Sequence, residues 1–193
     1  MKVFLAPPKG LIEKETYIEW LLAYGFKPTI LEVETKITAP LILAGGADIG
    51  VDLERDAKEF WWIQQALSEG HPIIGVCRGM QILNYYFGGT VKDLSGILNE
   101  DHSAADFADN ADHSGRPSQY HLVEDQTGYS TRVNSRHHQY CETLAANFTI
   151  THTGGNIIEG IEDLDRQIWA VQWHPERMES DDNLYPLDKL FAK

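Results

Sequence analysis

A cysteine with a glycine two residues away on each side could act as a nucleophile. Cys77 lies in Gly75-Val-Cys-Arg-Gly79, between a short apolar run and a helix-forming stretch. A tight strand-to-helix turn needs such glycines, because larger side chains would collide with the strand and the helix. The turn also places the sulfur at a helix N-terminus, which favours thiolate over thiol. The pattern therefore predicts a nucleophile rather than a buried structural cysteine.

A thiolate needs a proton acceptor that can later donate to a leaving group, and histidine is the usual choice. Among the eight histidines, His174 ends an apolar run and is followed by Pro175, which halts sheet pairing. Glu176 could hydrogen-bond the far imidazole nitrogen and hold its tautomer. Alone, this tripeptide could be a surface loop. Together with Cys77 it predicts a Cys–His–Glu triad.

The elements around these residues alternate between strands and helices in the first half of the chain. Apolar runs predict strands, helical periods predict the segments between them, and this alternation predicts a parallel sheet covered on both faces. The expected strands are 3–6, 29–33, 41–43 and 73–76, and the expected helices are 11–24, 54–69 and 79–87. The apolar faces are expected at Ile18, Leu21 and Leu22 of the first helix and at Ala57, Phe60, Trp61 and Leu67 of the second.

The second half is more polar and less regular. Residues 99–119 form a polar stretch without a period, with an acidic patch at 99–112, and predict a long loop. A metal could bind its histidines between 102 and 113, but a solvated loop is the favoured interpretation. Strands are expected at 148–152, 156–161 and 168–173, and an amphipathic piece at 187–191. Without repeats or linkers, residues 1–193 predict a single domain.

Composition and charge narrow the classes of partner. The chain has 193 residues and a formal net charge of −13, so it should repel the phosphate backbone of nucleic acids. The apolar run at 3–6 is too short for a signal peptide or a membrane span. Two cysteines are too few for a disulfide framework, and Cys141, which lies among polar residues, is interpreted as structural. A cytoplasmic location is expected.

Several stretches together resemble the class I glutamine amidotransferase superfamily and, within it, the γ-glutamyl hydrolase branch, which includes γ-glutamyl-GABA hydrolases. The resemblance covers most of the chain in the right order. It implies a flavodoxin-like α/β fold with a mixed, mostly parallel central sheet and helices on both faces. The matching stretches are Leu41-Ile-Leu-Ala-Gly-Gly-Ala-Asp48, Arg55-Asp-Ala-Lys-Glu59, Gly75-Val-Cys-Arg-Gly-Met-Gln-Ile-Leu-Asn84, Gly88-Gly-Thr90, Val133-Asn-Ser-Arg-His-His-Gln139 and Val171-Gln-Trp-His-Pro-Glu176.

The resemblance also assigns roles to individual residues. It implies that Cys77 attacks a γ-glutamyl amide to form a thioester, with His174 as base and Glu176 as its orienter. Backbone N–H groups of Gly46 and Arg78 would form the oxyanion hole. The glutamyl group would be held by Gly45, Gln81, Ser135, Arg136, His137 and His138. No cofactor or metal is implied, and adjacent histidines such as the last pair rarely ligate one ion because they point to opposite sides.

Two other functions stay open at this stage. A glutaminase subunit that delivers ammonia from glutamine to a separate synthase would have the same triad. A catalytically inactive binding protein is disfavoured by the intact Cys, His and Glu. The family usually has a longer segment where this chain has only 49–54, so the sequence does not define the leaving amine. The leaving amine could be a polyamine derivative, an amino acid or a nucleotide-linked amidate. The sequence is also compatible with a homodimer.

Overall fold

The computed structural model describes residues 1–8, 10–32, 35–94, 119–178 and 184–191. The helices are α1 (Leu11–Ala23), α2 (Leu53–Ser68), α3 (Arg78–Tyr86) and the short 3-10 helices η2 (Pro175–Arg177) and η4 (Leu187–Leu190). The strands are β1 (Lys2–Ala6), β2 (Lys27–Ile30), β3 (Leu41–Leu43), β4 (Ile73–Val76), β5 (Thr90–Asp93), β6 (Gln119–Asp125), β7 (Ser130–Ser135), β8 (Gln139–Thr143), β9 (Thr149–Gly154), β10 (Ile157–Asp163) and β11 (Ile168–Val171). No described helix is both long and apolar enough to cross a membrane.

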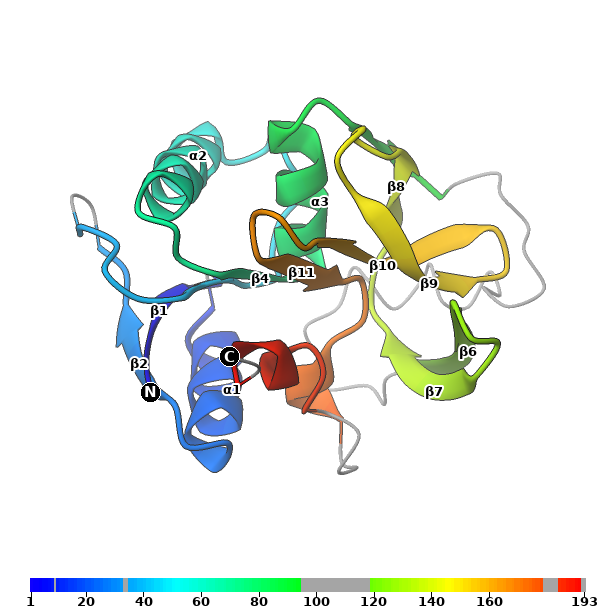
Figure 1. Ribbon diagram of the computed structural model, residues 1–193, viewed down its shortest axis with the longest axis horizontal. Coiled ribbons are helices and arrows are strands. Elements are labelled where there is room, and N and C mark those ends of the chain that lie inside the picture. Colours follow the sequence, from blue (N-terminus) through cyan, green and yellow to red (C-terminus); the bar gives the residue numbers. More distant parts are fainter. Residues whose placement is uncertain (9, 33–34, 95–118, 179–183, 192–193) are drawn as a thin grey trace.

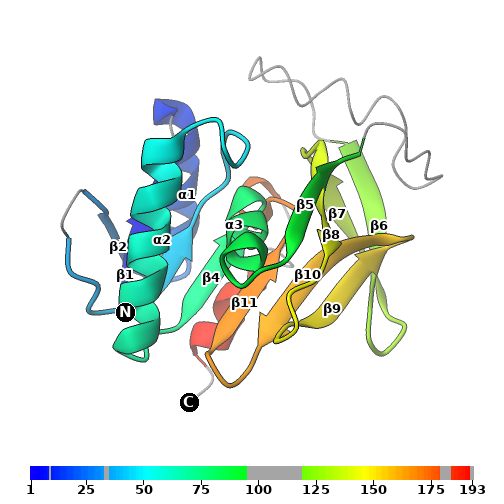
Figure 2. The same ribbon diagram turned by 90° about the horizontal axis from the view of Figure 1, so that it is seen from above.

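The central sheet is mixed. Its nine strands follow the order β2-β1-β3-β4-β11-β10-β9-β6-β7. The pairs from β2 to β11 are parallel, and those from β11 to β7 are antiparallel. Strands β5 and β8 form a separate antiparallel ribbon, which lies beside the antiparallel half (Figure 2). The parallel half therefore carries the strand-to-helix junction at Cys77, and β11 joins the two halves.

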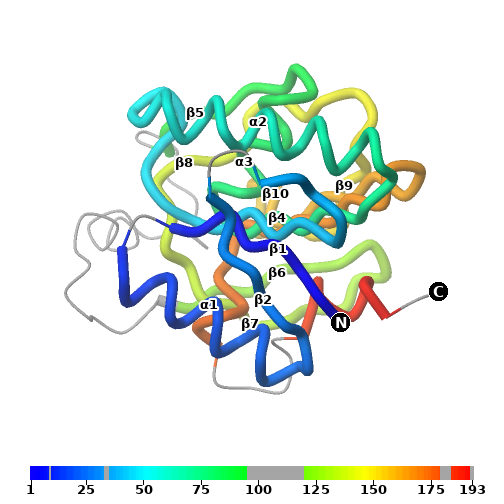
Figure 3. Tube along the Cα trace, turned by 90° about the vertical axis from the view of Figure 1, so that its left-hand side faces the viewer, coloured from blue at the N-terminus to red at the C-terminus, as the bar shows by residue number. Residues whose placement is uncertain are grey.

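Helices cover both faces of the parallel half, as predicted (Figures 1 and 3). Side chains alternate along β1, because successive residues of a strand point to opposite faces. Val3 and Leu5 pack in one cluster with residues of α1 and η4. Phe4 and Ala6 pack in the other, with residues of α2 and α3. The apolar runs in the sequence are thus strands that are buried on both sides.

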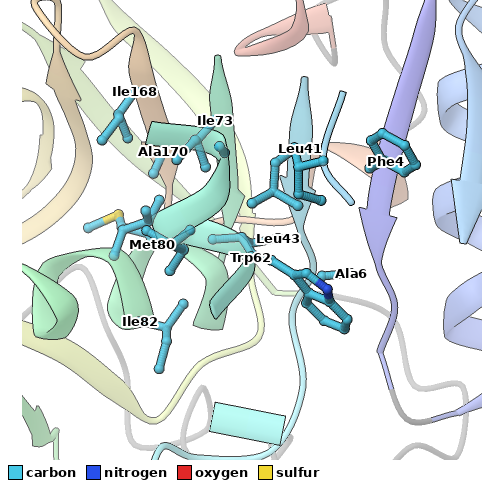
Figure 4. Close-up of a cluster of buried hydrophobic side chains, with 14 of the residues drawn as sticks. Phe4, Ala6, Leu41, Leu43, Trp62, Ile73, Met80, Ile82, Ile168 and Ala170 are labelled. Atoms are coloured by element: carbon cyan, nitrogen blue, oxygen red, sulfur yellow. The ribbon is translucent and has the colours of Figure 1, made fainter. Parts of the chain in front are cut away.

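The core beneath α2 includes residues of α3, the helix that begins directly after Cys77. Met80 and Ile82 of α3 and Trp62 of α2 pack on β3, β4 and β11 (Figure 4). Burial of these large apolar side chains, at about 25 cal/mol per Å² of apolar surface, stabilises the position of α3 on the sheet. The N-terminus of α3 is therefore held in place by the packing of this helix on the sheet.

The predicted apolar faces of α1 and α2 are wrong in part. In α1 the buried residues are Tyr17, Trp20 and Leu21, whereas Leu22 is 55% exposed. In α2 the buried residues are Asp56, Glu59, Trp62, Ile63 and Ala66. The buried face of α2 was expected to be apolar. Instead it includes the carboxylates of Asp56 and Glu59, which bind the buried guanidinium of Arg78.

Strands β5 to β8 were not predicted. Predicted strand 168–173 ends earlier, at Val171, and the piece at 187–191 is the short helix η4. The polar loop was predicted at 99–119. Its residues 99–118, with the acidic patch and the histidines, lie outside the described residues, and its last residue, Gln119, begins β6.

Candidate active site

Cys77 lies at the junction of β4 and α3, at the N-cap of the helix. Its backbone has φ 53° and ψ −108°, a conformation that a residue with a side chain rarely adopts. Its N–H donates to the carbonyl oxygen of Val171 over 2.7 Å. A Cβ on Gly75 would lie 2.7 Å from the backbone of Gly79, and a Cβ on Gly79 would lie 2.2 Å from the carbonyl oxygen of Leu43. Both glycines are thus required by close backbone contacts.

His174 and Glu176 follow β11, the strand next to β4. The imidazole Nδ1 of His174 lies 2.6 Å from Oε1 of Glu176. His174 also hydrogen-bonds Cys77. Burial alone would lower the pKa of His174, but the charges of Glu176 and Cys77, with hydrogen bonds to both, raise it to about 10. At neutral pH this arrangement favours the imidazolium form of His174.

A cavity of about 370 Å³ opens on Cys77 and His174. It contains most of the residues to which the sequence analysis assigned a role. They are Gly45, Gly46, Cys77, Gln81, Arg136, His137, His138, His174 and Glu176. Other charged residues that line it are Glu13, Asp48 and Arg177. Ser135 is buried beside Arg136 in the chain and is not among the residues that line this cavity.

The predicted binding residues already contact other parts of the protein. The side-chain amide of Gln81 donates to the carbonyl oxygen of Gln139 over 3.0 Å. His137 and His138 take different partners, as expected of adjacent residues. Nε2 of His137 lies 3.4 Å from buried Glu159, whereas Nε2 of His138 lies 2.9 Å from Oδ2 of Asp48. These contacts fix the segment between β7 and β8 at the wall of the cavity.

Arg78 has its side chain buried away from the cavity. The guanidinium binds Asp56 and Glu59 of α2. Its backbone N–H belongs to the first residue of α3, directly after Cys77. The first N–H groups of a helix have no partner within the helix, which leaves them free for an anion.

Three buried polar residues near the triad received no role in the sequence analysis. The hydroxyl of Tyr17 accepts from the N–H of Gly45 over 2.9 Å, and the charge of Glu176 influences it. The side-chain amide of Gln172 donates to Sγ of Cys77 over 3.5 Å. Asn134 contacts the backbone of His174. Gln172 and Asn134 stand in stretches that carry the family resemblance, whereas Tyr17 does not.

A metal centre is not formed by the residues that the structure describes. Among them, no group of three His, Cys, Asp or Glu side chains could hold a metal ion. The Cys77 sulfur and the His174 imidazole both line the cavity.

The fold is shared with solved amidotransferase structures. A protein of Thermoplasma acidophilum that is proposed to be a GMP synthase subunit superposes with a TM-score of 0.71. The match covers 98% of this chain and 91% of the other, at 17% identity. The chain therefore has the flavodoxin-like class I glutamine amidotransferase fold, as predicted.

The family follows from the sequence match. The model of the family Peptidase C26 matches residues 41–176, which include Cys77, His174 and Glu176. The chain thus belongs to the Peptidase C26 family of glutamine amidotransferase-like hydrolases.

Two relatives illustrate the range of this similarity. The proposed glutamine amidotransferase-like protein YvdE of Lactococcus lactis subsp. lactis is 34% identical over an alignment of 157 residues, and the match covers 70% of this chain and 65% of YvdE. The glutamine-hydrolysing GMP synthase of Oleidesulfovibrio alaskensis is 29% identical over 166 residues, covering 86% of this chain but only 30% of the synthase. The chain therefore spans less than two thirds of either relative.

Proposed function

We propose that this protein hydrolyses a γ-glutamyl amide through a glutamyl thioester on Cys77. The observation that carries the proposal is the chain of contacts from Cys77 to His174 to Glu176 at the wall of the cavity. Each member has the chemistry that its place requires: a sulfur nucleophile, an imidazole that moves protons, and a carboxylate that orients the imidazole.

The reaction has two steps. The Cys77 thiolate attacks the γ-carbonyl carbon, and the C–N bond breaks as the His174 imidazolium gives its proton to the departing amine. Water then loses a proton to His174 and attacks the thioester carbon, which releases glutamate and regenerates the thiolate. Because the pKa of His174 is raised to about 10, the imidazolium needed in the first step is present at neutral pH.

The carbonyl oxygen becomes negative in both steps and needs fixed donors. We propose the backbone N–H groups of Gly46 and Arg78, one from the loop after β3 and one from the start of α3. Fixed donors aimed at a developing oxyanion are usually the largest electrostatic contribution to acyl transfer. Gly45, Gln81 and the segment 136–138 line the cavity and would contact the glutamyl group. Ser135 could act only through its neighbours.

The acyl group is glutamate in this proposal, and the leaving amine is open. The cavity volume of about 370 Å³ and the charged side chains at its wall leave room for a substituted amide. Glu13 and Asp48 could contact a cationic amine, and Arg136 and Arg177 an anionic one. A polyamine derivative, an amino acid and a nucleotide-linked amidate are the candidates.

The second candidate function is a glutaminase subunit with a synthase partner. It is favoured by the similarity to a GMP synthase of which this chain covers only 30%. In such a protein the ammonia released from glutamine is used elsewhere in the assembly. The two functions share Cys77, His174 and Glu176, so they differ in substrate and in partner dependence.

Glutamate release by the purified chain separates the two functions. The assay compares glutamine with γ-glutamyl derivatives of a polyamine, of 4-aminobutyrate and of an amino acid, with Cys77→Ala as the blank. We expect at least one substituted amide to show a higher kcat/KM than glutamine, because contacts with the amine can be used in the transition state. If only glutamine is cleaved, and only after a synthase is added, the glutaminase function replaces this proposal.

A further inference from the structure

Side chains from two helices hold both polar backbone groups of Gly45. Its N–H donates to the hydroxyl of Tyr17 on α1 over 2.9 Å. Its carbonyl oxygen accepts from Nη2 of Arg55 on α2 over 2.9 Å, and Arg55 reaches the carbonyl oxygen of Ala44 at 3.3 Å. The two helices lie on opposite faces of the sheet (Figures 1 and 3). The loop after β3 is therefore held from both sides.

The hydrogen bond from Arg55 also determines where the next N–H points. The carbonyl of Gly45 and the N–H of Gly46 belong to one planar trans peptide, so they point in opposite directions. Gly45 and Gly46 line the cavity, whereas Arg55 does not. The carbonyl is directed at Arg55, away from the cavity, and the N–H of Gly46 is consequently directed to the cavity side.

We propose that Arg55 is a positioning residue that keeps the Gly45–Gly46 peptide in the orientation that presents the Gly46 N–H to the oxyanion. This inference rests on the proposed function for its catalytic consequence. Arg55 neither lines the substrate cavity nor contacts the triad, and it acts through the Gly45–Gly46 peptide.

The geometry of Gly46 supports the same role. Its φ of 145° lies in a region that favours glycine, and a Cβ there would lie 2.0 Å from Nη1 of Arg55. The loop and the guanidinium are thus packed so closely that a side chain at residue 46 would displace the guanidinium of Arg55. A glycine at this position follows from the presence of Arg55 as much as from the turn.

A buried cluster of charges holds Arg55 in place. Its Nε donates to Glu59 over 2.8 Å, and Glu59 also binds Arg78, the second proposed oxyanion residue. Asp56 binds Arg78 through one oxygen and accepts from the N–H of Gly50 over 2.7 Å through the other. Two guanidinium groups and two carboxylates balance each other. One cluster therefore underlies both proposed oxyanion donors and explains why α2 buries its carboxylates.

Three variants test the role of Arg55. Arg55→Met removes the donors, and Arg55→Lys keeps a positive charge beside Glu59 but lacks the planar fork. As a control, Lys58→Met removes a partly exposed charge from the same helix, one that pairs with Glu54. We expect kcat to fall about 10²-fold or more in Arg55→Met, as for loss of an oxyanion donor, with KM nearly unchanged. Arg55→Lys should keep the wild-type Tm and still lose kcat, whereas Lys58→Met should match the wild type.

A reversible aldehyde inhibitor and an alkylating agent distinguish positioning from a structural defect. The γ-aldehyde analogue of glutamine adds to Cys77 and forms a tetrahedral adduct that needs the oxyanion donors. Its affinity should fall in Arg55→Met and Arg55→Lys in parallel with kcat/KM. Alkylation of Cys77 by iodoacetamide needs no oxyanion donor, so its rate should stay at the wild-type value. Equal losses in alkylation and in turnover would overturn the proposal.

The orientation of the peptide can be observed directly in crystals of Arg55→Met. A rotated Gly45–Gly46 peptide, or two orientations, supports the inference, and an unchanged peptide contradicts it. This readout holds even if the proposed function fails, because that failure would show in the wild-type chain as an absence of glutamate release from every amide. The two failures are therefore distinguishable.

Discussion

Asn134 holds the backbone of His174 through both ends of its side-chain amide. Its Nδ2 donates to the carbonyl oxygen of His174 over 2.7 Å, and its Oδ1 accepts from the N–H of His174 over 2.8 Å. Asn134 is fully buried on β7, in the antiparallel half of the sheet. The imidazole at the end of β11 is thus positioned by a strand that lies on the far side of β10, β9 and β6 in the sheet order.

The change Asn134→Asp should disturb this contact while keeping the size of the side chain. A carboxylate cannot donate to the His174 carbonyl, so two acceptors would face each other in a buried place. We expect the free energy of unfolding to fall by about 1–3 kcal/mol, and kcat to fall because the imidazole loses its fixed position. Denaturant unfolding and glutamate release measure the two effects. Asn156→Ala, at an exposed turn, is the control; equal effects at both positions would contradict this role.

Removal of the base should cost more activity than removal of its orienter. His174→Ala deletes the proton carrier, whereas in Glu176→Gln the imidazole can still act when it reaches the right pose. We expect a larger loss of kcat in His174→Ala. The assignment of the base is wrong if His174→Ala stays active while His138→Ala does not.

The pH dependence should report the charge of Glu176. The folded pKa of His174, about 10, lies above its ordinary value of 6.5. The imidazolium and the stability that its partners give it are therefore fully present below about pH 6.5 and are lost as pH rises through about 10. Activity should fall on that alkaline side. In Glu176→Gln the alkaline limb of kcat should move to lower pH, and an unmoved limb would contradict the contribution of Glu176.

The two cysteines should differ in reactivity. Burial, and then the charge of Glu159, raises the pKa of Cys141 to about 12, so at neutral pH it is a thiol with no access to reagents. Cys77 lines the cavity beside His174. Iodoacetamide at neutral pH should modify Cys77 first, as shown by peptide mass spectrometry. Cys77→Ala should abolish turnover and Cys141→Ala should retain most of it; the reverse order would reject the nucleophile.

Tyr17 should matter to both stability and rate. Burial, and next the charge of Glu176, raises the pKa of Tyr17 well above its ordinary value, so the hydroxyl stays protonated. Tyr17→Phe leaves the buried N–H of Gly45 without its acceptor, at a cost of about 1–3 kcal/mol in the free energy of unfolding. We expect a matching loss of kcat, and no change in Tyr129→Phe, because Tyr129 is 69% exposed. Equal unfolding curves for Tyr17→Phe and the wild type would contradict the role of the hydroxyl.

The parts of the fold that the sequence predicts are those whose strands are buried on both faces. Strands such as β4 (Ile73–Val76) are continuous apolar runs, and glycines mark the ends of several neighbouring helices. Strands β6 to β8 contain many polar residues, because parts of them are exposed and parts face buried polar groups. Their sequences offer no contrast between faces from which a strand could be read.

The residues of the candidate site also fall into a group that the sequence predicts and a group that it does not. That Cys77, His174 and Glu176 meet at one cavity was predictable, because Gly75, Gly79 and Pro175 mark the backbone constraints beside them. The role of Tyr17 was not, because a tyrosine on an amphipathic helix looks like a core aromatic. Asn134 stands in a stretch that carries the resemblance, but its partner His174 lies 40 residues away in the chain. Their roles depend on tertiary contacts alone. The single domain over residues 1–193 and the cytoplasmic location stay predictions.

Trapping the acyl-enzyme tests the central claim most directly. The Cys141→Ala chain is mixed with a γ-glutamyl amide that it cleaves, quenched in acid during turnover, digested and analysed by mass spectrometry. We predict one glutamyl group on the peptide that contains Cys77, lost on treatment with hydroxylamine, which cleaves thioesters. Glutamate released at the full rate by the Cys77→Ala chain, or a glutamyl group found on any other residue, would contradict the account.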